Sequence, residues 1–270
     1  MDTDIILCGD AKDILMSIPS GSIDLVFTDP PYGTKTYNTD IVIDDDIWNG
    51  IRRVGTNLYA IWGYAKHLME WSKHFSDLKL LDYVVWIKYN EPNVSISLTR
   101  YHQDIAIWGV SKKQIHADRV RMPYSDNGAL ARFYSKGGTG EKAARLRSAR
   151  QERHPDGARC PDVWPIAAPH SGFSGHKNRL HPNEKPIEAA TRALLLLTDP
   201  GDIVLDPFCG SGTIPLACKL TNRRYIGIER DERFYSVSRD RIYSSEESKA
   251  RVDATSFGEA EAHHALTGGI

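Results

Sequence analysis

Short apolar segments alternate with segments of helical periodicity along most of the chain, and this alternation limits the fold to the α/β class. The first half carries predicted strands at 5–8, 23–27, 57–62, 83–87 and 104–108, and predicted helices at 11–18 and 65–75. The second half carries predicted strands at 203–205 and 224–228, and predicted helices at 186–197, 213–220 and 232–243. Such a pattern favours a sheet with helices on both faces. Since no clear helix separates 83–87 from 104–108, these two strands are predicted to form an antiparallel edge pair.

The segment from Ser111 to Cys160 has a different character, because Gly, Arg, Ser and Lys dominate it and its apolar periodicity fades. It holds twelve basic and five acidic residues, whereas the whole chain has a net charge of −1. A local positive excess attracts phosphate groups, although a solvated surface is the alternative explanation. We therefore predict an insertion at 111–165 between two halves at 1–110 and 166–245, and a polar tail at 246–270 with a composition typical of disorder.

Several classes of protein are disfavoured. No apolar run approaches the roughly 18 residues of a membrane span, and the first residues lack the order of a signal peptide, which predicts a cytoplasmic protein without a membrane partner. The four cysteines form no CxxC pair and the ten histidines show no metal-ligand spacing. We therefore expect neither a disulfide framework nor a metal site.

A glycine-containing turn lies between the predicted strand 203–205 and the predicted helix 213–220. Its sequence is Asp206-Pro207-Phe208-Cys209-Gly210-Ser211-Gly212-Thr213. Ligands bind beyond the carboxyl ends of parallel strands, and glycines there let the backbone approach a ligand closely. Glu229 ends the next strand, where a carboxylate can accept hydrogen bonds from ribose hydroxyls. The third glycine of the dinucleotide fingerprint is absent, so the pattern favours an adenosine cofactor without a pyrophosphate; a simple surface turn is the alternative.

A rigid loop, Asp29-Pro30-Pro31-Tyr32, follows the predicted strand 23–27. Two consecutive prolines fix the backbone and remove two N–H donors, which leaves free carbonyl groups beside a carboxylate and an aromatic ring. Such a loop can receive a planar ring that bears an amine: Asp29 and the Pro30 carbonyl would accept its hydrogens, and Tyr32 would stack on its face. A strand-terminating Asp-Pro turn is the alternative.

Lys185 lies in a third segment, His181-Pro182-Asn183-Glu184-Lys185-Pro186, directly before the helix 186–197. Its ammonium group could meet a carboxylate such as that of a methionine moiety, and Pro186 suits a first helical position. A capped helix start is the alternative.

The order of these motifs resembles that of the β-class amino-methyltransferases of DNA, with the catalytic tetrapeptide first, a target-recognition region in the middle and the cofactor glycine motif last. The resemblance covers about residues 5–243. It implies a seven-stranded, mostly parallel Rossmann-like methyltransferase sheet, circularly permuted, with a small inserted target-recognition region. It also implies S-adenosylmethionine as the cofactor and double-stranded DNA as the substrate; a homodimer and a cognate restriction endonuclease stay open as further partners.

The resemblance also assigns roles to single residues. Asp29, Pro30, Pro31 and Tyr32 match the tetrapeptide that holds a flipped base, and an opening Asp usually accompanies adenine N6, while cytosine N4 stays the alternative. The positions that correspond to cofactor contacts are Asp10, Ala11, Asp29, Lys185, Asp206, Phe208, Cys209, Gly210, Ser211, Gly212, Thr213, Glu229 and Arg230. Asn183 and Glu184 depart from the Thr-Gln pair that many relatives carry before the Lys-Pro.

The expected reaction is direct methyl transfer without a covalent enzyme intermediate. Two other classes stay open: a catalytically silent DNA-binding protein of the same fold, and a methyltransferase that acts on RNA or a small molecule. All enzymatic readings require the loop at 29–32 and the glycine turn at 210–212 to line one cavity.

Overall fold

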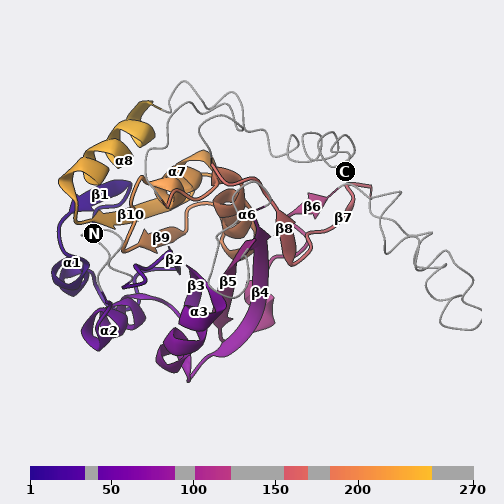
Figure 1. Cartoon of the computed structure of the whole chain (residues 1–270), viewed down its shortest axis with the longest axis horizontal. Helices are drawn as coiled ribbons and strands as arrows, with labels where there is room; N and C mark the ends of the chain where they lie inside the picture. The colour runs from indigo at the N-terminus through magenta and orange to yellow at the C-terminus, as the bar shows by residue number, and fades with distance from the viewer. Residues whose placement is uncertain (34–41, 89–100, 123–154, 170–182, 245–270) are drawn as a thin grey trace, which may run out of the picture. The chain divides into compact units, whose positions relative to one another are not determined.

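The computed structural model describes residues 1–33, 42–88, 101–122, 155–169 and 183–244 (Figure 1). The chain separates into two units, one of Met1–His116 with Pro161–Lys249 and one of Ala117–Cys160 with Ala250–Ile270. The predicted tail at 246–270 and most of the predicted insertion therefore lie outside the described residues. Among the described residues, the second unit holds a short antiparallel pair, β6 (Arg121–Met122) and β7 (Ala158–Arg159).

The first unit is built on one sheet whose strands follow the order β1-β10-β9-β2-β3-β5-β4-β8. The strands are β1 Ile5–Cys8, β2 Leu25–Thr28, β3 Leu58–Gly63, β4 Lys79–Ile87, β5 His102–Gly109, β8 Val163–Pro165, β9 Ile203–Asp206 and β10 Arg224–Glu229. Neighbouring strands are parallel except where β5 pairs with β3 and β4. The predicted mostly parallel sheet is confirmed, with eight strands in place of seven. The additional strand is β8, which pairs with β4 and makes β8, and not β4, the edge of the sheet.

Helices cover both faces of this sheet, as predicted (Figure 1). On one face lie α1 (Ala11–Ser17), α2 (Asp45–Val54), α3 (Ala65–Trp71) and the 3-10 turn η1 (Ser72–Phe75). On the other lie α6 (Ile187–Leu197), α7 (Thr213–Leu220) and α8 (Glu232–Ser244). Pro186 caps α6 and is not its first helical residue. Within the described ranges, no helix has the length and apolar character of a membrane span.

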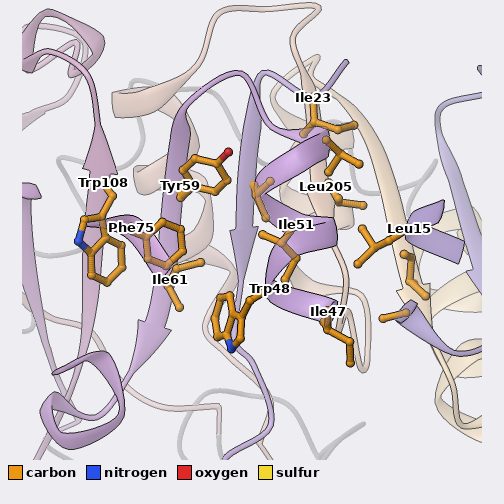
Figure 2. Close-up of a cluster of buried hydrophobic side chains, with 14 of the residues drawn as sticks. Leu15, Ile23, Ile47, Trp48, Ile51, Tyr59, Ile61, Phe75, Trp108 and Leu205 are labelled. Carbon is orange, nitrogen blue, oxygen red and sulfur yellow. The ribbon is translucent and has the colours of Figure 1, made fainter. Parts of the chain in front are cut away.

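The helix α2 was not predicted, although its sequence carries the signals of a helix. The Asp44 side chain caps it by accepting a hydrogen bond from the Ile47 N–H at 3.0 Å, and the first turn is acidic while the last turn is basic. Its apolar residues Ile47, Trp48, Ile51 and Val54 follow helical spacing and are all buried. Figure 2 shows three of them pointing into the core that α2 forms with the sheet.

The order of the strands creates a crevice near the centre of the sheet. From β9 the chain proceeds to β10 on one side, whereas from β2 it proceeds to β3 on the other side. Because helices diverge at such a switch point, the carboxyl ends of β9 and β2 border an open space. Asp206 ends β9 and Asp29 directly follows β2, so the two loops singled out in the sequence meet there.

Candidate active site

A cavity of about 590 Å³ lies at this switch point. Asp29, Pro30, Pro31 and Tyr32 line one part of it, and the residues 206–211 with Thr213 line another. The requirement that the two loops share one cavity is therefore met. The cavity also includes Asp10, Ala11, Lys185, Glu229 and Arg230, so it gathers every predicted site residue except Gly212.

Asp29 is held by two partners on opposite sides of its carboxylate. The Lys185 ammonium forms an ion pair with Oδ2, and the Tyr32 hydroxyl donates to Oδ1 at 2.5 Å. Lys185 is itself buried, and its ammonium lies 5.7 Å from the ring centre of Trp62 and 3.2 Å from the Asn183 carbonyl oxygen. The lysine that was expected beside a cofactor carboxylate thus contacts the carboxylate of the proline loop. Its charge fixes Asp29 in one orientation.

The ring of Tyr32 packs against an aromatic wall on α3. It stacks on His67 with ring centres 4.8 Å apart and on Trp71 at 5.9 Å, and Tyr64 lies tilted against it at 5.6 Å. Gln103 donates to the Tyr32 hydroxyl at 3.4 Å. These contacts hold the tyrosine ring at the cavity with little rotational freedom.

Asp206 lines the cavity from the end of β9 and is buried. Its carboxylate accepts hydrogen bonds from the Thr28 hydroxyl at 2.6 Å and from the Phe208 N–H at 3.2 Å. Burial, which disfavours the charged form, outweighs these bonds and raises the pKa of Asp206 to about 7. Burial also raises the pKa of the Cys209 thiol, which disfavours a thiolate nucleophile and agrees with direct transfer.

Glu229 fixes the glycine turn from the end of β10. Its carboxylate accepts from the Gly210 N–H at 2.9 Å and from the Asp231 N–H at 2.8 Å, and burial raises its pKa. Asp10, the predicted adenine contact, caps α1 by accepting from the Lys12 N–H at 2.9 Å. Both carboxylates are therefore positioned by backbone bonds before any ligand binds.

Gly212 has a structural position and does not line the cavity. It caps α7 with a φ of 76°, and a β-carbon there would lie 2.9 Å from Cβ of Ser238 on α8. Beside it, Arg241 of α8 donates to the Ser211 carbonyl and to the Thr213 hydroxyl, and forms an ion pair with Glu184 at 2.9 Å. Glu184, which departs from the family pattern, is thus paired with Arg241. Through Arg241, α8 connects the segment that holds Glu184 and Lys185 to the glycine turn.

Some cavity residues were missed by the sequence analysis. Asp231, Arg233 and Phe234 follow β10 directly. The rule that drew attention to Glu229, proximity to the carboxyl end of a parallel strand, would also have indicated them. Ile47 was missed because it lies on α2, the helix that was not predicted.

Comparisons with known proteins agree with this geometry. Residues 54–240 match the model of the N6_N4_Mtase family, described as DNA methylase. The chain is 26% identical over 260 residues to the type II methyltransferase M.HpaI of Haemophilus parainfluenzae, covering 88% of this chain and 74% of the relative. It is 25% identical over 268 residues to M2.MboI of Moraxella bovis, covering 87% of this chain and 86% of the relative.

Solved structures share the fold at lower sequence identity. The protein TTHA0409 of Thermus thermophilus, solved in complex with S-adenosyl-L-methionine, gives a TM-score of 0.53 at 20% identity, covering 88% of this chain and 94% of that chain. The PvuII DNA methyltransferase, described as cytosine-N4-specific, gives 0.57 at 15% identity, covering 87% and 85%. With the family model spanning well over half of its length, the chain belongs to the N6_N4_Mtase family of DNA methylases, which transfer a methyl group from S-adenosylmethionine to an amino group of a DNA base.

Proposed function

We propose that this chain methylates N6 of an adenine that has been flipped out of duplex DNA. The observation that carries the proposal is the fixed carboxylate of Asp29 at the cavity, held by Lys185 and Tyr32. In the resembled family, Asp at this position usually accompanies adenine. Cytosine N4 is the second candidate, since its amine offers the same two hydrogens and a structural neighbour is described as cytosine-N4-specific.

The residues of the cavity suit S-adenosylmethionine. Six carboxylates and only three basic side chains line it, which fits a ligand that carries a sulfonium and an ammonium group. Glu229 and Asp10 would meet the adenosine portion, with Ala11 and Arg230 beside them. The backbone at 208–211 with Thr213 would enclose the methionine portion, and Asp206 would lie beside it. The cofactor supplies an electrophilic methyl group.

The proline loop would then hold and activate the base. Asp29 accepts one hydrogen of the amine and the Pro30 carbonyl accepts the other, which turns the nitrogen lone pair out of the ring plane. Pro31 keeps this loop rigid, and Tyr32 stacks on the base from its aromatic wall. On accepting the methyl group, whose bond to sulfur would break to leave a neutral thioether, the base nitrogen would become cationic. The Asp29 carboxylate would stabilise that charge until the nitrogen loses a proton to solvent. Alignment in the closed site provides much of the rate.

The base that is modified can be identified directly. The wild-type chain is incubated with labelled S-adenosylmethionine and long unmethylated duplex DNA, RNA, or no acceptor, and the products are hydrolysed to nucleosides. We expect N6-methyldeoxyadenosine from the duplex alone. Recovery of N4-methyldeoxycytidine would show that the target base is cytosine and not adenine. Label in RNA alone would refute a DNA substrate. An Asp29→Ala variant is the control, expected to bind the cofactor without transfer.

The proposal also assigns roles to the remaining parts of the chain. The basic insertion at 111–165 reads the DNA sequence, between a catalytic half at 1–110 and a cofactor half at 166–245. The two curated relatives are named as type II methyltransferases, which supports a role beside a restriction endonuclease. Sedimentation of the chain with and without DNA tests the homodimer.

A further inference from the structure

Lys88 is a buried cation at the same end of the sheet as the proline loop, where β2 and β4 terminate. It directly follows β4, and its N–H donates to the Tyr101 carbonyl just before β5, at 2.5 Å. Because β5 pairs antiparallel with both β3 and β4, this end of β4 and the carboxyl end of β3 lie at the same end of the sheet, with β5 between them. Lys88 is not part of the cofactor cavity, and only 7% of its surface is exposed.

Among the described residues, this ammonium group contacts neutral aromatic side chains. Nζ lies 3.5 Å from the Tyr64 hydroxyl, 5.6 Å from the Tyr64 ring centre and 5.8 Å from the Trp86 ring centre. Within the part of the chain that the structure describes, Lys88 forms no ion pair. Aromatic faces offset part of the cost of burying a cation, but an enclosed lysine is normally paired with an anion.

The position of Tyr64 connects this cation with the base. Tyr64 caps α3 directly after β3, and its ring packs against Tyr32, the residue expected to stack on the flipped base. Lys88 is therefore separated from Tyr32 by one aromatic residue, Tyr64. A base that enters the site remains attached to its sugar, so the phosphates that flank the target nucleotide must lie near the rim of the site.

We propose that Lys88 binds a phosphodiester of the DNA strand that carries the target nucleotide. This inference rests on the proposed function, since it requires a DNA substrate, but it does not depend on which base is methylated. The lysine acts as a point charge, and Tyr64 and Trp86 hold its side chain in place. It contributes to DNA binding and fixes the position of that DNA strand relative to Asp29.

The test is the salt dependence of methyl transfer by the full chain. Label transfer from S-adenosylmethionine to long unmethylated duplex DNA is measured from 50 to 200 mM salt for the wild type, Lys88→Met, Lys88→Gln and Lys88→Arg. Lys79→Met is the matched control, because Lys79 is exposed at the opposite end of the same strand. Each phosphate contact contributes about 0.9 to the slope of log affinity against log salt.

We expect Lys88→Met and Lys88→Gln to lower the magnitude of this slope by about 0.9 and to raise the KM for DNA about fivefold at 0.15 M salt, with the KM for the cofactor unchanged. Lys88→Arg and Lys79→Met should keep the wild-type slope. A wild-type slope and KM in the folded Met or Gln variant would refute the phosphate contact and leave the lysine a structural cation. If the wild type itself transfers no label to DNA, the proposed function fails, and that outcome is distinct.

Discussion

Asp29 directly follows β2 and Asp206 ends β9, the two strands at the switch point. The surroundings of their carboxylates differ. Both residues line the cavity, but Asp29 is partly exposed and has a cationic partner, whereas Asp206 is buried and hydrogen-bonded to a hydroxyl. The sequence predicts where both residues lie, because strand ends in a parallel sheet share one edge. It does not predict the pairing of Asp29 with Lys185, which are 156 residues apart and whose contact depends on how the chain brings two loops together.

A lysine that positions Asp29 should affect turnover and not cofactor binding. Removing one member of a buried ion pair destabilises the folded arrangement by about 3–5 kcal/mol, because the other charge is left without a partner. We expect Lys185→Met to lower kcat at least about 100-fold with little change in the KM for S-adenosylmethionine, and Lys185→Arg to restore part of the rate. Steady-state kinetics at saturating DNA measure both constants. A large rise in the cofactor KM at unchanged kcat would return Lys185 to the role that the sequence suggested.

The raised pKa of Asp206 predicts a pH dependence of stability. The folded-state pKa of about 7 lies above the ordinary value of 3.8, so the folded chain binds the proton more tightly and the free energy of unfolding falls as the pH rises between these values. Asp206→Asn removes this loss and keeps the contact with Thr28. We expect its gain in Tm over the wild type to be larger at pH 8 than at pH 5 by at least about 3 °C.

Thermal unfolding at the two pH values measures this difference, and Asp2→Asn, at an exposed carboxylate, is the control with no expected pH-dependent gain. Equal gains for Asp206→Asn at both pH values would show that the buried carboxylate is ionised throughout the range.

At the scale of helices and strands, the segments with strong apolar periodicity or clear turn residues could be predicted closely. The bounds of β1 and α7 match their predicted ranges, and β9 and β10 extend one residue further. The helix α2 and the strand β8 were not predicted from the sequence, for different reasons. The caps and spacing of α2 are visible in its sequence, whereas β8 is three residues long and exists because β4 offers an edge to pair with.

The junction between the glycine turn and α8 can be tested with two glycines that share a left-handed backbone. Gly201 has a φ of 92° with no atom within 4 Å of an added β-carbon, while Gly212 has a φ of 76° and would meet Ser238. We expect Gly201→Ala to cost about 1–2 kcal/mol from backbone strain, and Gly212→Ala to cost about 1–3 kcal/mol more from the clash. Urea unfolding measures the loss in the free energy of unfolding for each variant. Equal losses would mean that α8 moves away from the added β-carbon at Gly212 without destabilising the fold.

For the molecule as a whole, the cavity needs both halves of the chain. The proline loop comes from the first half, and the glycine turn, Lys185 and Glu229 come from the second. The proline loop and the glycine turn follow β2 and β9, which pair directly. The family resemblance predicted this arrangement, because motif order implies permuted connections. Most of the basic insertion, residues 123–154, lies outside the described residues.

Two fragments should therefore reassemble. We expect chains 1–137 and 138–270, cut between Gly137 and Gly138, to bind S-adenosylmethionine when produced together and to bind none when produced separately. Calorimetry on the purified pair and on each fragment measures this. Wild-type affinity in the second fragment alone would show that Asp10 and the proline loop are dispensable for the cofactor.

The pairing at the centre of the sheet also has a consequence for biosynthesis. Thr28 and Asp206, joined by a hydrogen bond, are 178 residues apart, so a ribosome working at about 5–20 residues per second completes the first roughly 10 to 35 s before the second. During that interval the newly made β2 waits without its central neighbour, exposed to chaperones and proteases. Catalytic competence consequently arises late in translation, and a message cut short upstream of β9 yields polypeptide that modifies no genome.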